Sequence, residues 1–497
     1  MIQQLLDSMR LFIPETVLAG TFCLLLLIEV MTRGRKFPLA WIALLGLAVS
    51  AFFASRGAEG GTAAFFNMIA VDRFALFFKY LVFGGSALVI LFSMQSSELN
   101  TGTRRLGEYY ALLIALTLGM VLMTGASNLL MMYLSLELTS ISSYILSGYT
   151  KEAEDSAEAS LKYVIYGAVS SGMMLYGISI LYGLTGAVDI YGVHGALAAG
   201  DTNVAALIIA GILILVGFGY KISAVPFHFW TPDVYEGAPI TITAFLSVAS
   251  KAAGFAMMIR FLKVTFLDAA VGGLTPGAWA TLPGFDWSTI LSAISVLTMT
   301  LGNLVAVWQN NLKRLLAYSS IAHAGYLLLG VVVISNQGIA AVLVYFVVYL
   351  FMNLGAFCAV MFVANKTGSE DIEAYNGLGY RSPFIAGALT VFLLSLTGIP
   401  PTAGFVGKLY IFAALIDAKL FWLAVVGVLN SVLSLYYYIR IIRNMYLRTP
   451  DKAEPFRLSA VQYLILLLLV LPTLILGVYF GPLVEYAQAS VSMFGIR

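Results

Sequence analysis

The chain has 497 residues, of which 60% are hydrophobic and only 10% are charged, and its mean hydropathy is +0.93. No soluble domain of this length has such a composition, so the sequence predicts an integral membrane protein in the lipid bilayer. The net charge of +2 gives no case for nucleic-acid binding. The sequence contains neither a GxGxxG in a Rossmann pattern nor a Walker loop, so we expect no nucleotide chemistry in this chain.

Apolar runs of spanning length recur from one end of the chain to the other. Residues 1–11 carry Asp7 and Arg10, and the next run is long enough to span rather than to be cleaved as a signal. At about 20 residues per span, we expect about fourteen transmembrane helices. The expected spans are 12–31, 38–55, 73–95, 108–124, 127–148, 159–185, 204–223 with a continuation past Pro226, 240–266, 287–308, 313–335, 338–364, 383–417 with a break at Pro400-Pro401, 421–446 and 460–485.

The distribution of lysine and arginine predicts the orientation. With the N-terminus outside, the inner joints hold fifteen basic residues: Arg33, Arg35, Lys36, Arg104, Arg105, Lys151, Lys313, Arg314, Lys366, Arg381, Arg440, Arg443, Arg448, Lys452 and Arg457. The outer segments hold seven: Arg10, Arg56, Arg73, Arg260, Lys263, Lys419 and Arg497. The positive-inside rule therefore predicts that both termini lie outside.

Five of the 27 basic residues remain, and all five fall in or at the ends of spans. We expect Lys79 and Lys162, near span ends, to extend to the membrane interface. Lys221, Lys251 and Lys408 lie deeper, where charged side chains are rare and usually line ion pathways. We interpret these three as functional residues.

Each of the three lysines has an unusual surrounding sequence. Lys221 precedes Pro226 and His228, and a proline in a span frees backbone groups that only protein or internal water can satisfy. Lys251 is flanked by small residues, which suit close helix packing. Lys408 follows the break at Pro400-Pro401. Charges beside helix breaks indicate an internal polar path.

Two further residues could belong to this path. Glu137 is the only acid in its span, and Ser135, Thr139 and Ser140 are close enough in sequence to hydrogen-bond to it. A carboxyl buried alone stays neutral, whereas beside a lysine it could ionise. His323 is either a member of a proton relay or a polar residue satisfied near a helix start, and the sequence favours neither. Cys23 and Cys358 are isolated, cannot form a zinc or iron–sulfur site, and are expected to be small core residues.

The positions of the breaks suggest an internal repeat. The seventh and twelfth spans each carry a lysine and a proline break, and an offset of five spans reverses direction in the membrane. Paired broken spans in corresponding halves indicate an inverted-repeat transport site. We therefore divide the chain into N-terminal helices 1–3 (1–107), a first repeat of spans 4–8 (108–266), a second, inverted repeat of spans 9–13 (287–446) and a C-terminal helix 14 (447–497).

Several long motifs resemble a known family, the antiporter-like membrane subunits of respiratory complex I. They include LSLELTSISSYILSGY around Glu137, KISAVPFHFWTPDVYEGAP after Lys221, LAYSSIAHAGY around His323 and GIPPTAGFVGKLYIF around Lys408. The resemblance covers nearly the whole chain and is greatest to subunit N. The PFHFWTPDVYEGAP motif is also shared with multisubunit cation/proton antiporters, so a subunit of such an antiporter is the alternative. A passive scaffold is a third hypothesis, made improbable by the energetic cost of four ionisable residues within spans.

The resemblance implies an all-α fold of fourteen helices with discontinuous helices 7 and 12, in the bacterial cytoplasmic (inner) membrane. It implies a proton relay in which Glu137 and Lys221 form a coupled pair, Lys251 is central, Lys408 leads to the exit and His228 is a further member. It implies a translocase subunit without its own redox centre, with NAD, FMN, iron–sulfur clusters and quinone bound by partner subunits. The implied partners are a neighbouring antiporter-like subunit, small membrane subunits of the K, J and A type, and the lateral helix of subunit L.

Overall fold

The computed structural model describes residues 2–32, 38–57, 61–100, 106–200, 202–268, 280–281, 286–449 and 457–493. The first half of the chain forms α1 (Ile2–Leu11), α2 (Ile13–Thr32), α3 (Leu39–Gly57), β1 (Thr62–Ala64), β2 (Ile69–Val71), α4 (Arg73–Ser93), α5 (Leu106–Gly125), α6 (Leu129–Ser147), α7 (Glu154–Thr185), α8 (Ile190–Ala198), α9 (Val204–Ile222), α10 (Trp230–Gly237), α11 (Ile240–Phe245), the π-helix η1 (Leu246–Ser250) and α12 (Lys251–Phe266).

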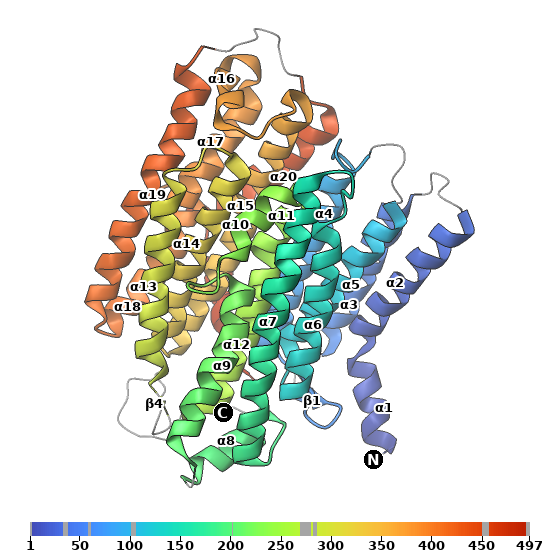
Figure 1. Cartoon of the computed structure of the whole chain (residues 1–497), viewed down its shortest axis with the longest axis vertical. Helices are drawn as coiled ribbons and strands as arrows, with labels where there is room; N and C mark the ends of the chain where they lie inside the picture. The colour runs from blue at the N-terminus through green and yellow to red at the C-terminus, as the bar shows by residue number, and fades with distance from the viewer. Residues whose placement is uncertain are drawn as a thin grey trace.

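The second half contains β3 (Leu267–Asp268), β4 (Ala280–Thr281), α13 (Trp287–Ala306), α14 (Leu312–Val332), α15 (Asn336–Thr367), the 3₁₀ helix η2 (Ile372–Tyr375), α16 (Leu378–Arg381), α17 (Pro383–Thr397), α18 (Ala403–Asp417), α19 (Phe421–Leu447), α20 (Ala460–Val478) and α21 (Gly481–Ala489). The long helices lie side by side in one bundle, with α1 and α8 at one end and α16 at the other (Figure 1). The two antiparallel strand pairs, β1 with β2 and β3 with β4, are short.

Thirteen helical segments of the described chain are long and apolar enough to cross a membrane. The broken helix formed by α17 and α18 supplies a fourteenth span, because each half has only 15 residues. The predicted all-α membrane fold with about fourteen spans is therefore confirmed. The last predicted span, 460–485, is too long: α20 ends at Val478, four residues before Pro482, whose ring would clash with the carbonyl group of residue 478 in a continuous helix.

The two predicted helix breaks are present, and protein groups satisfy the freed backbone at both. Ser223 ends α9 in the left-handed region with φ of 63°. The indole of Trp230 donates to the carbonyl oxygen of Tyr220 at 3.0 Å, and the amide of Val225 donates to Thr298 at 3.0 Å. Gly398 ends α17 with φ of 90°, and the amide of Gly404 donates to the Ser395 hydroxyl at 3.0 Å.

A third irregularity has no counterpart in the predictions. The π-helix η1 lies between α11 and α12 in a region that is fully buried, and it ends immediately before Lys251. Single π turns inside longer helices occur frequently at functional sites because they widen the helix and reorient side chains locally. All three candidate lysines therefore lie at or beside an interruption of regular α-helix.

Two buried ion pairs correct the assignment of residues near span ends. Lys79 does not extend to the interface: its amine donates to Glu15 at 2.6 Å, and both side chains are buried. Arg260 does not lie in an outer segment. It is fully buried in α12, where its two terminal nitrogens donate to Asp72 at 2.7 and 2.8 Å. These two pairs therefore connect α4 to α2 and α12 to the start of α4.

The structure also tests the predictions made for Lys263, Lys162 and the two cysteines. Lys263, assigned to an outer segment, is buried near the end of α12, where its amine donates to Asn336 at 3.0 Å. Lys162 is partly exposed and pairs with Glu158 and Asp233, each at 2.6 Å. Cys358 is buried as expected, but Cys23 is exposed on the outside of the bundle, so its prediction as a core residue is wrong. The predicted inner residues Arg33, Arg35, Lys36, Arg104, Arg105 and Lys452 and the predicted outer residue Arg497 lie outside the described ranges.

Candidate functional site

Lys221 lies in the last turn of α9, directly before the first helix break. Only 1% of its surface is exposed, and its amine contacts the Ser140 hydroxyl of α6 at 3.5 Å, the upper limit for a hydrogen bond. Within the described residues it has no carboxylate partner within 4.0 Å. The fold therefore holds an amine in the bundle interior with a single long polar contact.

Glu137 lies on α6 one turn before Ser140, whose hydroxyl contacts the Lys221 amine, so Glu137 and Lys221 lie near each other on two helices. They do not form an ion pair in the structure. The carboxyl oxygen Oε1 of Glu137 is buried and has no hydrogen-bond partner among the described residues. The side chain is half-buried and lies beside exposed apolar residues of α6 such as Leu134 and Ile141. The predicted pair is thus placed in one neighbourhood but not in contact.

Lys251 begins α12 immediately after the π-helix. Its side chain is 1% exposed, and its amine donates to the backbone carbonyl oxygen of Ser320 on α14 at 2.9 Å. The aromatic ring of Tyr235 lies 6.0 Å from the amine, at the outer limit of a cation–π contact. Lys251 therefore contacts a neutral carbonyl group and an aromatic ring. A buried lysine that served only to hold the fold together would be expected to pair with a carboxylate.

Lys408 lies in α18, after the second break. Its amine donates to the carbonyl oxygens of Leu396 at 3.2 Å and Thr397 at 2.8 Å, and to the Ser431 hydroxyl at 2.8 Å. It also lies 4.5 Å from the ring centroid of Tyr326. The two carbonyl groups end α17, where the helix dipole favours a positive charge. The end of α17 at the helix break therefore provides polar contacts for Lys408, which is only 3% exposed.

His323 lies between the last two lysines along one face of α14. Ser320, His323 and Tyr326 are spaced by three residues, so their side chains share one side of the helix. The backbone carbonyl oxygen of Ser320 accepts from the Lys251 amine, and the ring of Tyr326 lies 4.5 Å from the Lys408 amine. One ring nitrogen of His323 is hydrogen-bonded to the Tyr345 hydroxyl at 2.7 Å, and the other lies 3.5 Å from the Tyr438 hydroxyl. His323 is therefore hydrogen-bonded, as expected of a satisfied polar residue. It also lies between Lys251 and Lys408, as a member of a proton relay would have to.

His228 lies in the turn between α9 and α10. It is buried, and its Nδ1 atom has no hydrogen-bond partner among the described residues. The six predicted site residues therefore lie at three places: Glu137, Lys221 and His228 near the first break, Lys251 at the π-helix, and His323 with Lys408 near the second break. The linking residues Ser320 and Tyr326 were not singled out from sequence, although their spacing around His323 was visible there.

A single methyl group added at Gly398 is expected to displace Lys408. Gly398 has φ of 90°, and a Cβ atom there would lie 2.9 Å from Cδ of Lys408. A Gly398→Ala variant should lose about 1–2 kcal/mol of stability from the left-handed backbone alone, which is measured as a lower melting temperature. Gly387→Ala is the matched control, because a Cβ atom added at Gly387 in the same helix would meet no other atom within 4 Å. A melting temperature of Gly398→Ala equal to or above that of Gly387→Ala would contradict the tight fit of Lys408 against Gly398.

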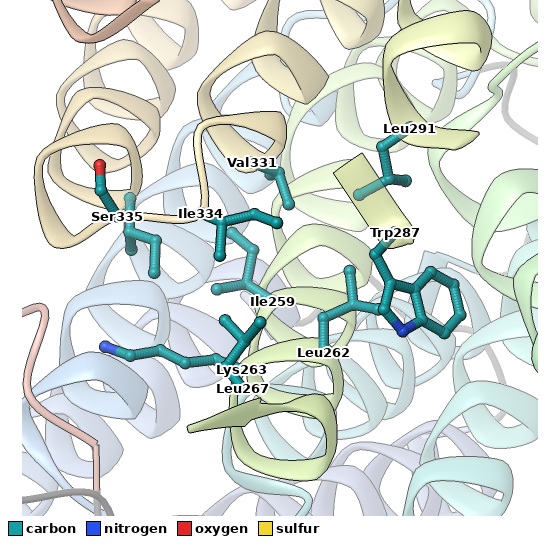
Figure 2. Close-up of a pocket in the computed structure, with 10 residues that line it drawn as sticks. Ile259, Leu262, Lys263, Leu267, Trp287, Leu291, Val331, Ile334 and Ser335 are labelled. Atoms are coloured by element: carbon teal, nitrogen blue, oxygen red, sulfur yellow. The ribbon is translucent and has the colours of Figure 1, made fainter. Parts of the chain in front are cut away.

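A small cavity of about 30 Å³ lies away from these residues, at the end of α12. Its lining is mostly apolar, and includes Trp287 and Leu291 of α13 and Val331 of α14 (Figure 2). The Lys263 side chain extends away from Trp287 in this view (Figure 2). Across the described part of the chain, no three His, Cys, Asp or Glu side chains gather as metal ligands. The cavity therefore does not contribute a polar site.

The fold and the buried lysines define a class of protein: the antiporter-like membrane subunits. The family model described as "NADH:quinone oxidoreductase/Mrp antiporter, TM" matches residues 126–434. In solved structures, the chain is similar to one from "Respiratory complex I from Thermus thermophilus with bound Aureothin", at 28% identity and a TM-score of 0.77 over 96% of this chain and 99% of that chain. It shares its fold with a chain of the "Mrp complex from Dietzia sp. DQ12-45-1b", at 21% identity and a TM-score of 0.79 over 99% of this chain and 97% of that one.

A curated relative distinguishes between the two kinds of complex. NADH-quinone oxidoreductase subunit N 2 of Chloroherpeton thalassium is 48% identical over 99% of this chain and 97% of its own length. The chain belongs to the NADH-quinone oxidoreductase subunit N family. It is a multi-pass membrane subunit of a respiratory complex, and the resemblance predicted from its motifs is confirmed.

Proposed function

We propose that this subunit translocates protons through a relay formed by Glu137, Lys221, Lys251 and Lys408, with His228 and His323 as further members. One contrast carries the proposal. The buried cations Lys79 and Arg260 each have a carboxylate partner. Across the described residues, Lys221, Lys251 and Lys408 have none within 4.0 Å and contact only hydroxyl groups, carbonyl groups or rings.

This contrast matters because a buried charge without a counter-ion is energetically costly. A charged side chain at the bilayer centre costs at least several kcal/mol, so such residues are usually functional. An amine that is not neutralised by a fixed carboxylate can gain or lose a proton when its surroundings change. The titrations of neighbouring groups are then coupled, so that a change at one site changes the protonation of the next.

In this proposal, a conformational change acts on the relay at Glu137 and Lys221. They lie near each other on two helices, α6 and α9, without forming an ion pair. A small displacement of α6 relative to α9 would bring the carboxylate towards the amine or away from it, and would load or release a proton. The helix break beside Lys221 allows such a displacement without leaving backbone groups unsatisfied.

The energy for this motion comes from outside the chain in our proposal. Moving one charge across the membrane costs about 2.3 kcal/mol per 100 mV, and redox chemistry in partner subunits would supply it. NAD, FMN, iron–sulfur clusters and quinone belong to those partners, and this chain performs no redox step. Its neighbours would be another antiporter-like subunit, the small K-, J- and A-type subunits and the lateral helix of subunit L.

We further propose that the relay joins two inverted units, 108–266 and 287–446, flanked by helices 1–3 (1–107) and helix 14 (447–497). Both termini would lie on the outer side of the bacterial inner membrane. Burial of Arg260 and Lys263 in α12 supports this orientation. Removing these two leaves five of the seven basic residues outside, and removing the buried Lys313 leaves fourteen of the fifteen inside, so the asymmetry predicted from sequence remains.

The test is a Lys251→Ala variant in the assembled complex. We expect loss of proton pumping, because Lys251 is the only one of the three lysines placed between the two helix breaks. Lys366→Ala, which removes an exposed lysine at the end of α15, is the control and should pump normally. The rate of pumping is measured in membrane vesicles and divided by the amount of assembled complex. A Lys251→Ala complex that pumps at the wild-type rate would overturn the proposal.

A further inference from the structure

The hydrogen bonds around the Lys408 amine are arranged for an ammonium group. An ammonium group has three hydrogens, and three acceptors face it: the carbonyl oxygens of Leu396 and Thr397 and the hydroxyl oxygen of Ser431, at 3.2, 2.8 and 2.8 Å. Ser431 accepts from the amine, because its single hydroxyl hydrogen is donated to the carbonyl oxygen of Thr397 at 2.9 Å. A neutral amine has only two hydrogens, so it would turn its lone pair towards one of these oxygens.

The ring of Tyr326 is the fourth contact of this amine. The amine lies over the ring, 4.5 Å from its centroid, and the tyrosine is 1% exposed. The face of an aromatic ring is electron-rich and attracts a cation, most strongly where water is excluded. Among the described residues no carboxylate lies within 4.0 Å of Lys408. The ring therefore takes the place of a counter-ion.

Asn303 of α13 fixes the hydroxyl end of Tyr326. Its side-chain amide donates to the Tyr326 hydroxyl at 3.2 Å and to Oδ1 of Asn430 at 3.1 Å, so both amide hydrogens are used. The Oδ1 atom of Asn303 accepts from the Tyr437 hydroxyl at 3.0 Å. All four side chains are buried. Tyr326, which belongs to α14, is therefore attached to α13 and, through Asn303, to α19.

The helix α19 contacts both sides of this arrangement. Asn430 bonds to Asn303, and the next residue along α19, Ser431, accepts from Lys408. The helices α13, α14, α18 and α19 pack against one another and lie together on one side of the bundle (Figure 1). The position of the ring and the position of the amine are therefore both set by contacts with α19.

We propose that Tyr326 binds the ammonium form of Lys408 with the face of its ring, and that Asn303 is the positioning residue that orients this ring. Protonation of Lys408 strengthens the contact and loss of the proton weakens it, so the ring helps Lys408 to keep a proton that arrives through the relay. The Tyr326 hydroxyl takes no part in proton transfer. The inference rests on the proposed function, because the contact affects pumping only if Lys408 gains and loses a proton.

Two substitutions at position 326 test the contact in the assembled complex. Tyr326→Phe keeps the ring, whereas Tyr326→Leu keeps an apolar side chain without a ring. We expect Tyr326→Leu to pump about tenfold more slowly than wild type, because a desolvated cation–π contact shifts an equilibrium by at least about that factor. Tyr326→Phe should retain most of the rate. Tyr176→Leu is the matched control and should pump normally, because Tyr176 is 64% exposed on α7.

Fluorinated phenylalanines at position 326 separate the charge of the ring from its shape. Added fluorine atoms withdraw electrons from the ring face, which weakens its attraction for a cation, and change the size of the ring little. Pumping is measured in membrane vesicles and divided by the amount of assembled complex. We expect the rate to fall stepwise as fluorine atoms are added, and to stay constant for the same series at position 176. Equal rates throughout the series at position 326 would overturn the proposal.

A double-mutant comparison tests the role of Asn303. We expect Asn303→Ala to slow pumping severalfold in the wild-type background and much less in Tyr326→Phe, where the hydrogen bond to Asn303 is already lost. An equal loss in the two backgrounds would show that Asn303 does not act through Tyr326, and would overturn its assignment as a positioning residue.

A Lys408→Ala complex distinguishes this inference from the proposed function. Loss of pumping by Lys408→Ala, with wild-type rates for Tyr326→Leu and for the fluorinated series, would overturn the role of Tyr326 and leave the relay in place. Normal pumping by Lys408→Ala would overturn the relay, and this inference with it.

Discussion

An assembled complex that carries Lys221→Ala is expected to lose proton pumping. The variant removes a buried amine at the end of α9 that has no carboxylate partner among the described residues and only a 3.5 Å contact with Ser140. Alanine cannot accept a proton, so the relay would be interrupted beside the first helix break. Pumping is measured in vesicles and compared with the amount of assembled complex and with the rate of NADH oxidation.

Two companion variants separate proton transfer from packing. Lys221→Met keeps most of the side-chain volume but not the titratable group, so we expect it to fail as Lys221→Ala does. Glu137→Ala leaves Lys221 in place but removes the carboxyl group that we propose as its partner in the relay, and we expect it also to slow pumping. Pumping at the wild-type rate by an assembled Lys221→Met complex would contradict the assignment of Lys221.

The largest effect on stability is expected from Arg260→Ala. Arg260 is fully buried and forms two charge-assisted hydrogen bonds with Asp72, which also caps α4 by accepting from the amide of Ala75 at 2.8 Å. Removing one partner of a buried ion pair leaves an uncompensated charge and typically costs about 3–5 kcal/mol. The expected result is a lower thermal stability of the subunit and less assembled complex.

Two other variants test whether the uncompensated charge of Asp72 causes this loss of stability. Arg56→Ala removes an exposed arginine at the end of α3, and it should leave the melting temperature unchanged. Asp72→Asn combined with Arg260→Ala removes the orphaned charge but keeps an amide that can cap α4, and it should recover part of the loss. A melting temperature for Arg260→Ala equal to that of Arg56→Ala would contradict the structural role of the pair.

The spans and the two helix breaks could be predicted from sequence because their signals are local. Runs of about 20 apolar residues define spans, and Pro226 and Pro400-Pro401 mark breaks by removing backbone donors. The π-helix before Lys251 could not be predicted in this way. Its residues, Leu246–Ser250, contain neither proline nor glycine, and the irregularity arises from packing in the centre of the bundle.

The paired cations were misassigned because their partners are distant in sequence. Glu15 lies 64 residues before Lys79, and Asp72 lies 188 residues before Arg260. Counting charges near span ends cannot distinguish a residue at the interface from one that pairs across helices. The three candidate lysines were identified correctly as buried because each sits well inside an apolar run, and burial is confirmed for each. Their functional role stays a prediction.

The face of α14 shows what sequence spacing could have added. Ser320, His323 and Tyr326 recur every three residues, which places them on one side of a helix. That spacing does not say which lysines they face. The structure supplies the contacts: Lys251 donates to the backbone carbonyl oxygen of Ser320, and Lys408 lies against the ring of Tyr326. The path that we propose would run through α9, α12, α14 and α18, of which α9 packs on α12 and α14 packs on α18.

Ordered water in the interior would show whether the buried lysines form one proton path. The measurement is an experimental structure of the assembled complex at a resolution that shows water molecules. We predict water that bridges Glu137 and Lys221, then Lys221 and Lys251, and then Lys251 through His323 to Lys408. Dry apolar packing between any two consecutive lysines, in every state of the complex that can be resolved, would contradict a continuous path.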